Sequence, residues 1–415
     1  MTTAGFVLYG AYLLSGLANE WSLRLLGGKA YISTVAVALL PVAWLMSGNI
    51  TRSMRHPLGR CWMLFLLWLV LATPFSVWRG GSAALLWSWV PKNFLCYFYA
   101  CAFATSMARC RQLMYVNIAG AWWLLLTCIA FGAAPAQAGE TRFHIPNSLF
   151  YDNANDLALA LLMGMASLFH LFWKRGVLKR LIAGSGVLLC AIYSLKTASR
   201  GGLIAGASLL GLGLFLGRVR WKALVLGVPV LGVALAALPA STLHRLSLVA
   251  PGADIVTSAD RSSAASQAER AELFHKSLDY TLMHPLLGVG PGQFSTAVHL
   301  EAAEAGRHVP WLGTHNTYTE ISSEAGIPAL ILHCAIVVLC LRANYRVHQR
   351  ARRDGSMGET AGLSFCLLAS SVVYAVSTFF FHIAYSVTLP ALAGFTAALE
   401  SAAADGDRPA PPPLY

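Results

Sequence analysis

The sequence predicts an all-α integral membrane protein with about 12 transmembrane helices and one long extramembrane loop that contains helices of its own. Three observations support this fold class. Hydrophobic residues make up 57% of the 415 residues and charged residues only 12%, which is about half the charged share of a soluble domain. Apolar runs of ~20 residues, long enough to cross a bilayer as helices, recur along nearly the whole chain. Basic residues cluster on alternate loops between these runs.

Twelve apolar runs are assigned as spans, in chain order. They cover 4–18, 31–48, 61–78, 83–107, 113–131, 154–173, 181–197, 201–217, 223–240, 319–341, 361–381 and 384–400. The first run lacks the basic start of a cleavable signal, so we expect it to be a transmembrane helix. The nine cysteines lie in or beside these runs, so we expect neither a disulfide framework nor a zinc site.

Basic residues indicate how the spans are oriented. Five loops carry basic clusters, the first with Arg52, Arg55 and Arg60, and all five fall on the side that also holds both termini. Because lysine and arginine gather in cytoplasmic loops, we place both termini in the cytoplasm. The net charge of +12 is then explained by orientation, and we expect no nucleic-acid partner.

The spans divide the chain into four parts. Residues 1–240 hold the first nine transmembrane helices, and residues 319–400 hold the last three. Between them, residues 241–318 form the long non-cytoplasmic loop, in which residues 264–283 have the apolar stripe of an amphipathic helix. Residues 401–415 are rich in proline towards their end, which predicts a disordered cytoplasmic tail.

Polar side chains gather where the long loop meets an apolar run. We predict Thr314 as a helix N-cap, which places His315 in the first helical turn. The positive end of the helix dipole disfavours imidazolium, so a neutral His315 can act as a general base. Asn316 and Glu320, four residues apart, can brace one another. The alternative is a histidine that only caps or hydrogen-bonds the loop backbone.

Two arginines are candidates for binding phosphate. Arg200 lies on the non-cytoplasmic side, against the general charge pattern, and a guanidinium binds phosphate bidentately. Gly201 and Gly202 after it allow a ligand to approach the backbone. The alternative for Arg200 is a side chain that snorkels to the membrane surface. Arg270, on the amphipathic loop helix, is a phosphate candidate only in company with Arg200 and His315, and is otherwise a solvated surface arginine.

Other polar residues lie near the same side of the membrane. Asn155 and Asp156 open a span, where one asparagine is expected to cap the helix and the others to hydrogen-bond a sugar or phosphate. Lys92 follows Pro91 inside a span, as a phosphate contact or as part of a structural ion pair. The sequence contains no HExxH, Walker or GxSxG pattern, so we expect no metal and no cofactor.

Together these motifs resemble the bacterial O-antigen ligase family, whose superfamily includes O-antigen polymerases and protein O-oligosaccharyltransferases. The resemblance covers about 150 to 330 by motif. The matching stretches are Asn155-Asp156, Ser199-Arg200-Gly201-Gly202, Arg270, Pro285 to Phe294, and His315-Asn316 with Gly326 after nine residues. Near the last pair of spans the family often has an acidic residue, where this chain has His382 and Tyr385.

The resemblance implies an O-antigen ligase in the bacterial inner membrane, with the active site and the long loop facing the periplasm. The donor is an undecaprenyl-diphosphate-linked glycan and the acceptor is the lipid A–core oligosaccharide, with inversion at the anomeric carbon and no metal. The family's catalytic histidine corresponds to His315, and its diphosphate-binding arginines to Arg200 and Arg270. The supporting or substrate-binding candidates are Asn316, Glu320, Asn155, Asp156 and Lys92.

Other functions are compatible with parts of the pattern. An O-antigen polymerase would use the same donor with a growing glycan as acceptor, and the residues alone leave this choice open. A protein O-oligosaccharyltransferase would transfer the glycan to protein. A transporter of lipid-linked sugar would favour pseudo-symmetric halves and charged or broken helices at the midplane, and the sequence has no clear internal repeat.

Overall fold

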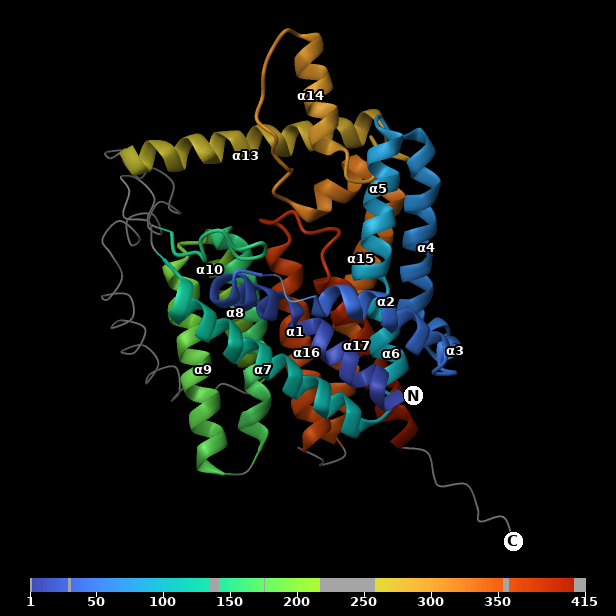
Figure 1. Ribbon diagram of the computed structural model, residues 1–415, viewed down its shortest axis with the longest axis vertical. Coiled ribbons are helices and arrows are strands. Elements are labelled where there is room, and N and C mark those ends of the chain that lie inside the picture. Colours follow the sequence, from blue (N-terminus) through green and yellow to red (C-terminus); the bar gives the residue numbers. More distant parts are fainter. Residues whose placement is uncertain are drawn as a thin grey trace.

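The structure is a computed structural model that describes residues 2–28, 31–133, 142–174, 176–216, 258–353 and 358–406. The regular elements in these ranges are helices (Figure 1), with one isolated bridge between Ala133 and His144. The prediction of an all-α chain is therefore confirmed for the described residues.

The helices follow the apolar runs of the sequence. The first seven are α1 (Thr2–Leu26), α2 (Ile32–Leu45), α3 (Ile50–Arg55), α4 (Pro57–Ala72), α5 (Arg79–Trp89), α6 (Cys96–Phe103) and α7 (Met107–Phe131). The next three are α8 (Ala154–Leu168), α9 (Val177–Lys196) and α10 (Arg200–Phe215). After these come α13 (Ser258–Met283), α14 (Phe294–Glu304), α15 (Thr317–Arg353), α16 (Glu359–Ser377) and α17 (Thr388–Gly406).

Six helical segments in the described ranges are long and apolar enough to cross a membrane. They are Pro57–Phe75, Met107–Phe131, Ala154–Trp173, Val177–Lys196, Thr317–Arg353 and Glu359–Ser377. The helices α2 and α10 are apolar but shorter. The structure therefore agrees with an integral membrane protein, while the count of twelve spans stays a prediction. The predicted span 223–240 lies outside the described residues.

The predicted span 83–107 is not one continuous helix. α5 ends at Trp89, a π-helical turn covers Val90–Phe94, and α6 begins at Cys96. Pro91 has no amide hydrogen to donate to the preceding turn, and this loss interrupts regular α-helical bonding. The predicted span 83–107 therefore contains a π-helical turn, and its crossing of the membrane stays a prediction.

Two other boundaries differ from the sequence prediction. α17 continues to Gly406, so residues 401–406 are helical and do not belong to the predicted tail. Ala402 is buried against the rest of the bundle, and this packing extends the helix. α15 is also longer than predicted and reaches Arg353. The rest of the tail, residues 407–415, lies outside the described residues.

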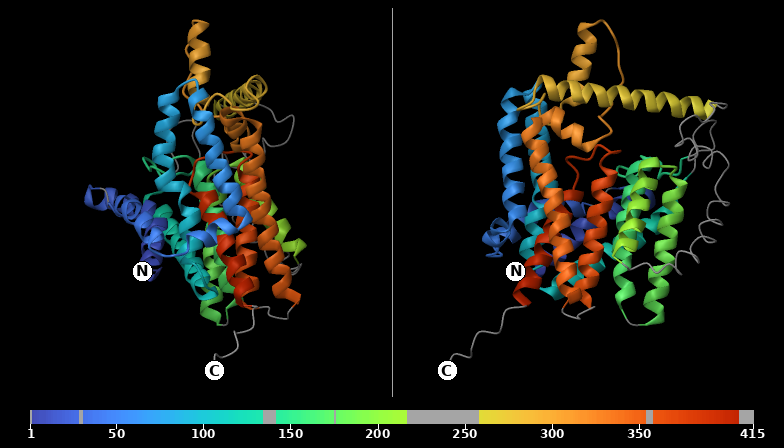
Figure 2. Two further views of the ribbon diagram at one scale, coloured as in Figure 1. Left: turned by 90° about the vertical axis from the view of Figure 1, so that its right-hand side faces the viewer. Right: turned by 180° about the vertical axis from the view of Figure 1, so that it is seen from behind.

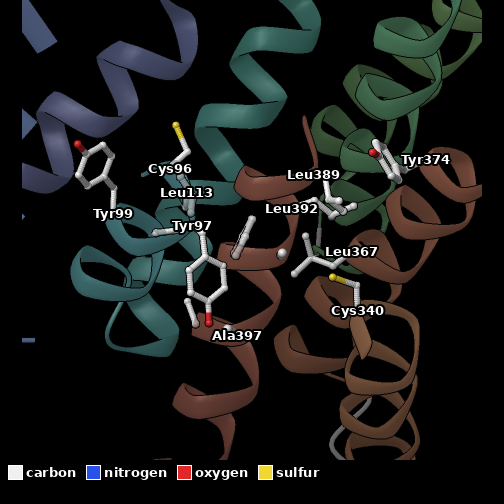
Figure 3. Close-up of a cluster of buried hydrophobic side chains, with 14 of the residues drawn as sticks. Cys96, Tyr97, Tyr99, Leu113, Cys340, Leu367, Tyr374, Leu389, Leu392 and Ala397 are labelled. Atoms are coloured by element: carbon white, nitrogen blue, oxygen red, sulfur yellow. The ribbon is translucent and has the colours of Figure 1, made fainter. Parts of the chain in front are cut away.

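The helices form a bundle that α13 crosses at one end (Figures 1 and 2). In Figure 1 α4 and α5 stand on one side, α8 and α9 on the other, and α15, α16 and α17 between them. α14 projects beyond α13, away from the bundle. Figure 3 shows part of the apolar core, where Tyr97, Leu113, Cys340, Leu367 and Leu392 are buried. This core fixes the ends of α15, α16 and α17, which carry the candidate site.

Candidate active site

His315 lies just before α15 rather than in its first turn. Asn316 is the capping residue, because its Oδ1 accepts hydrogen bonds from the amides of Tyr318 at 2.9 Å and Thr319 at 3.2 Å. Thr314 instead donates its hydroxyl to the carbonyl of Asn316 at 2.9 Å. The predicted cap was therefore wrong by two residues, and asparagine is at least as good a cap as threonine.

The backbone of His315 is in the left-handed region, with φ of +53°. Ala198, two residues before Arg200, shares this conformation with φ of +47°. Such values are uncommon outside glycine and gather at functional sites. His315 lies two residues before α15, and Ala198 lies two residues before α10. Candidate site residues lie at the beginning of both helices.

The segment between α16 and α17, residues 378–387, is tied to the start of α15. The amide of Thr317 donates to the carbonyl of Thr378 at 2.9 Å. The hydroxyl of Thr317 donates to the carbonyl of Phe381 at 2.6 Å and accepts from the amide of Ile383 at 3.0 Å. One buried threonine thus fixes the backbone on both sides of residue 382.

These bonds place His382 beside His315. The two imidazole rings are 4.9 Å apart between centroids and meet edge to face, at 86°. Gly313 makes room for His382, because a Cβ at residue 313 would lie 2.8 Å from the Cδ2 of His382. His382 was not among the predicted site residues. Its position near the last pair of spans, where the family often has an acidic residue, was the only sequence signal for it.

Positive groups surround this histidine pair. Burial, and after it the neighbouring His382 and Arg270, lowers the pKa of His315 from 6.5 to about 4. Partial burial and Arg270 also lower the pKa of His382. Burial, and next the nearby Arg200 guanidinium, lowers the pKa of Arg270, against the opposing effect of Glu269. Arg270 is thus within electrostatic reach of both Arg200 and His315, and both imidazoles are neutral at neutral pH.

Arg200 is the first residue of α10. Ser199 caps this helix by accepting a hydrogen bond from the amide of Gly202 at 3.1 Å. Gly201 packs against the 378–387 segment so closely that a Cβ there would lie 2.6 Å from the Cβ of Phe380. The sequence predicted that Gly201 lets a ligand approach the backbone closely. In the structure the 378–387 segment makes this close approach instead, and the packing holds Arg200 next to the segment that carries His382.

Asn155 supports Arg200 from the start of α8. Asn153 is the N-cap of α8, since its side chain accepts from the amide of Asn155 at 2.9 Å. The buried Oδ1 of Asn155 accepts from the hydroxyl of Ser199 at 2.9 Å and from the guanidinium of Arg142. Asp156 follows, half-buried, in the first turn. Asn155 therefore links the beginnings of α8 and α10.

Lys92 lies on the π-helical turn with an exposed side chain. Its carbonyl accepts from the hydroxyl of Tyr12. The next residue, Asn93, donates its side-chain amide to the carbonyl of Tyr385 at 2.9 Å, so the turn touches the 378–387 segment. Across the described ranges, however, no contact joins the ammonium group of Lys92 to the histidine pair.

The sequence predicted that Glu320 and Asn316 brace one another, but the Glu320 side chain binds the backbone of the 378–387 segment instead. Its carboxylate accepts from the amide of Ala384 at 3.1 Å, whereas the side chain of Asn316 is occupied in capping. Glu324, one turn further and buried, was missed from the sequence. It accepts from the hydroxyl of Tyr385 at 2.8 Å. Its two oxygens also accept from the backbone amides of residues 292 and 294, at 2.7 and 3.1 Å.

The glycine-rich turn after α13 docks into a kink in α15. Gly326 has φ of +81°, and a Cβ there would lie 2.0 Å from the carbonyl oxygen of Leu286. The amide of Ile327 donates to the carbonyl of Pro285 at 2.8 Å, and that of Gly290 to the carbonyl of Glu324 at 2.8 Å. These bonds fix the end of α13, and with it Arg270, relative to the start of α15.

The described residues hold no group of three or more histidine, cysteine, aspartate or glutamate side chains that is arranged to bind a metal ion. The expectation of a metal-free site stays a prediction. The charged chemistry near His315 comes instead from guanidinium groups.

Comparison with known proteins bears on the same region. Residues 184–334 match a protein-family model described as O-antigen ligase. The matched segment runs from α9 into α15 and contains Arg200, Arg270 and His315. No curated protein matches the chain.

Proposed function

Because residues 184–334 match a family model described as O-antigen ligase, we propose that the chain is an O-antigen ligase. It transfers a glycan from undecaprenyl diphosphate to a sugar hydroxyl of lipid A–core, at the periplasmic face of the bacterial inner membrane. The observation that carries the proposal is the gathering of His315, Arg270 and Arg200 at one end of the bundle, inside the matched segment.

His315 is the general base of this reaction. A sugar hydroxyl of the acceptor attacks the anomeric carbon while the bond from that carbon to the diphosphate oxygen breaks. The hydroxyl proton passes to the neutral imidazole, and the bonding electron pair leaves with the diphosphate. Attack from the face opposite the leaving group inverts the anomeric centre. His382 lies edge-on to His315 and helps to keep the imidazole neutral before substrate binds.

Arg200 and Arg270 bind the donor diphosphate. Two guanidinium groups can form charge-assisted hydrogen bonds to its oxygens and stabilise the charge that develops on the leaving group. The bound diphosphate also places negative charge near His315, which favours imidazolium and raises the pKa of His315 from about 4. The base is therefore strengthened when the donor is in place, and no cofactor is needed.

The remaining candidates have supporting roles. Asn155 holds the start of α10 behind Arg200, while Asn316 and Glu320 hold the start of α15 and the segment that carries His382. Asp156 and Lys92 are kept as substrate-binding candidates on the same side of the bundle.

The deciding experiment supplies purified protein with undecaprenyl-diphosphate-linked glycan, with and without lipid A–core. Glycan on the core supports the ligase. Longer lipid-linked chains in both reactions would indicate an O-antigen polymerase, and glycan on an added protein would indicate an oligosaccharyltransferase. No transfer at all, with lipid-linked glycan moved across proteoliposome membranes, would indicate a transporter. Transfer should continue in EDTA, and its loss would contradict the metal-free mechanism.

A further inference from the structure

Trp311 forms an aromatic platform beyond α13. Its ring stacks on that of His299 from α14, with 3.5 Å between ring centroids and 14° between the planes. The Trp311 side chain is nonetheless 67% exposed, so the face that does not contact His299 is open. The ring thus presents apolar surface that a ligand could cover.

Both layers of the platform are held by one serine. The carbonyl of Ser295 accepts a hydrogen bond from the Nδ1 of His299 at 2.9 Å, which orients the lower ring. The hydroxyl of Ser295 donates to the carbonyl of Leu312 at 2.7 Å, which fixes the backbone next to Trp311. The exposed ring is therefore set in place before any ligand arrives, which lowers the entropic cost of binding.

The position of the platform argues against lipid as its occupant. His299 lies on α14, which projects beyond α13 on the side away from the bundle (Figures 1 and 2). The helices long and apolar enough to span a membrane are on the other side of α13. Trp311, stacked on His299, therefore lies with α14 and away from those helices.

The platform is continuous in the chain with the histidine pair. Trp311 lies four positions before His315, a separation of at most about 14 Å of extended chain. Gly313, between them, packs against His382. An oligosaccharide with one sugar beside His315 can therefore reach Trp311 with another of its sugars.

We propose that Trp311, backed by His299, is a glycan subsite that stacks on a pyranose ring a few sugars away from the bond being made. This inference rests on the proposed function. The C–H groups on one face of a pyranose are apolar and weakly positive, and they suit the negative face of an aromatic ring. The ligand is an oligosaccharide, carried either by the lipid-diphosphate donor or by the lipid A–core acceptor.

The test compares Trp311→Ala and Trp311→Phe with wild type, using steady-state kinetics with each substrate varied in turn. Trp311→Ala should raise the KM of one glycan substrate roughly three- to tenfold, as expected for one lost aromatic stack, with kcat nearly unchanged. Trp311→Phe should raise the same KM by a smaller factor, and it keeps the test informative if the alanine variant misfolds. Trp87→Ala is the matched control, because Trp87 is 86% exposed on α5 and should leave both KM values unchanged.

The substrate whose KM rises identifies the source of the glycan. Saturation-transfer NMR with two lipid-free probes, the core oligosaccharide and the glycan released from the donor, gives a readout that does not need transfer. Trp311-dependent binding of either probe supports the subsite even if the wild-type protein transfers nothing, in which case only the ligase proposal fails. Equal KM values and equal probe binding in wild type and both Trp311 variants would overturn the subsite.

Discussion

The two ends of α16 use positive charge in different ways. At its first residue, Glu359 pairs with Arg111 at 2.9 Å and with Lys174 at 2.9 Å. Beyond its last residue, His382 and His315 meet, and burial, with Arg270 as a further cause, lowers the pKa of both. Cations at the first end are matched by a carboxylate of the protein. Under the proposed function, the second end receives its anion from outside, as the diphosphate of the donor.

The strongest test of this difference is to remove the proposed base, His315, at the second end. His315→Ala should lower kcat for glycan transfer by about 10²- to 10⁴-fold, because proton transfer from the acceptor hydroxyl loses its acceptor. Binding of the donor should be retained, since Arg200 and Arg270 are unchanged. Transfer rates with saturating donor and a pull-down of donor by the variant measure the two effects separately.

His275→Ala provides a histidine control on the helix that carries Arg270. His275 is exposed on α13, five residues after Arg270, and bonds only to the carbonyl of Ala271 among the described residues. Its loss should leave transfer within about twofold of wild type. Normal transfer by His315→Ala would remove His315 from the role of base.

The arginines distinguish the two ends more directly. Arg200→Ala and Arg270→Ala should each lower kcat/KM for the donor by about 10²-fold, as expected when one group that stabilises the leaving charge is lost. Arg200→Lys and Arg270→Lys keep the charge but lose the bidentate geometry, so a smaller loss is expected. Kinetics at varied donor concentration give these values.

Arg111→Ala is the matched arginine control at the first end of α16. Its ion pair with Glu359 is partly exposed, and such pairs contribute little to stability. Transfer should therefore be close to wild type. If Arg111→Ala and Arg270→Ala lowered glycan transfer equally, the contrast between the two ends of α16 would be wrong.

The docking of α13 against α15 can be tested by a single added methyl group. Gly326→Ala should destabilise the protein by at least about 2 kcal/mol, because residue 326 has a left-handed backbone and its Cβ would meet the carbonyl of Leu286. The apparent midpoint of thermal unfolding in detergent measures this. Gly184→Ala, in α9 with open space around its Cβ, should be neutral or slightly stabilising. Equal midpoints for both variants would contradict a tight junction at Gly326.

The sequence predicted where helices lie along the chain better than it predicted which segments pack against them. The helical segment Ala154–Trp173, α9 and α10 begin and end within four residues of their predicted spans, because apolar length and capping residues are local signals. The break at Pro91 was also a local signal, but one proline does not show how many residues leave the α-helical pattern. The unpredicted length of α17 depends on burial of Ala402, which only the packed bundle provides.

The candidate site shows the same limit. His315 and Arg200 could be selected because each is a polar residue at a membrane boundary, a position that is costly without a task, and Arg270 only in company with them. Glu324 could not be selected, and His382 had no signal beyond its position near the last pair of spans. The place of His382 depends on bonds from Thr317 to a segment more than 60 residues later, and the role of Glu324 depends on the turn that follows α13. Contacts of this range leave no pattern in one sequence.

The pH dependence of transfer gives the finest test of the charge at the second end. His315 accepts a proton only when neutral, so activity should fall as the pH drops through its pKa. In the free enzyme that pKa is about 4, and the acidic limb of kcat/KM should report it. The bound diphosphate raises the pKa, so the acidic limb of kcat should lie at higher pH. Arg270→Ala removes a cation that lowers the pKa, and its kcat/KM limb should therefore move to higher pH, while that of Arg111→Ala stays in place. If the acidic limb of kcat/KM is the same in Arg270→Ala as in wild type, Arg270 does not act on the base.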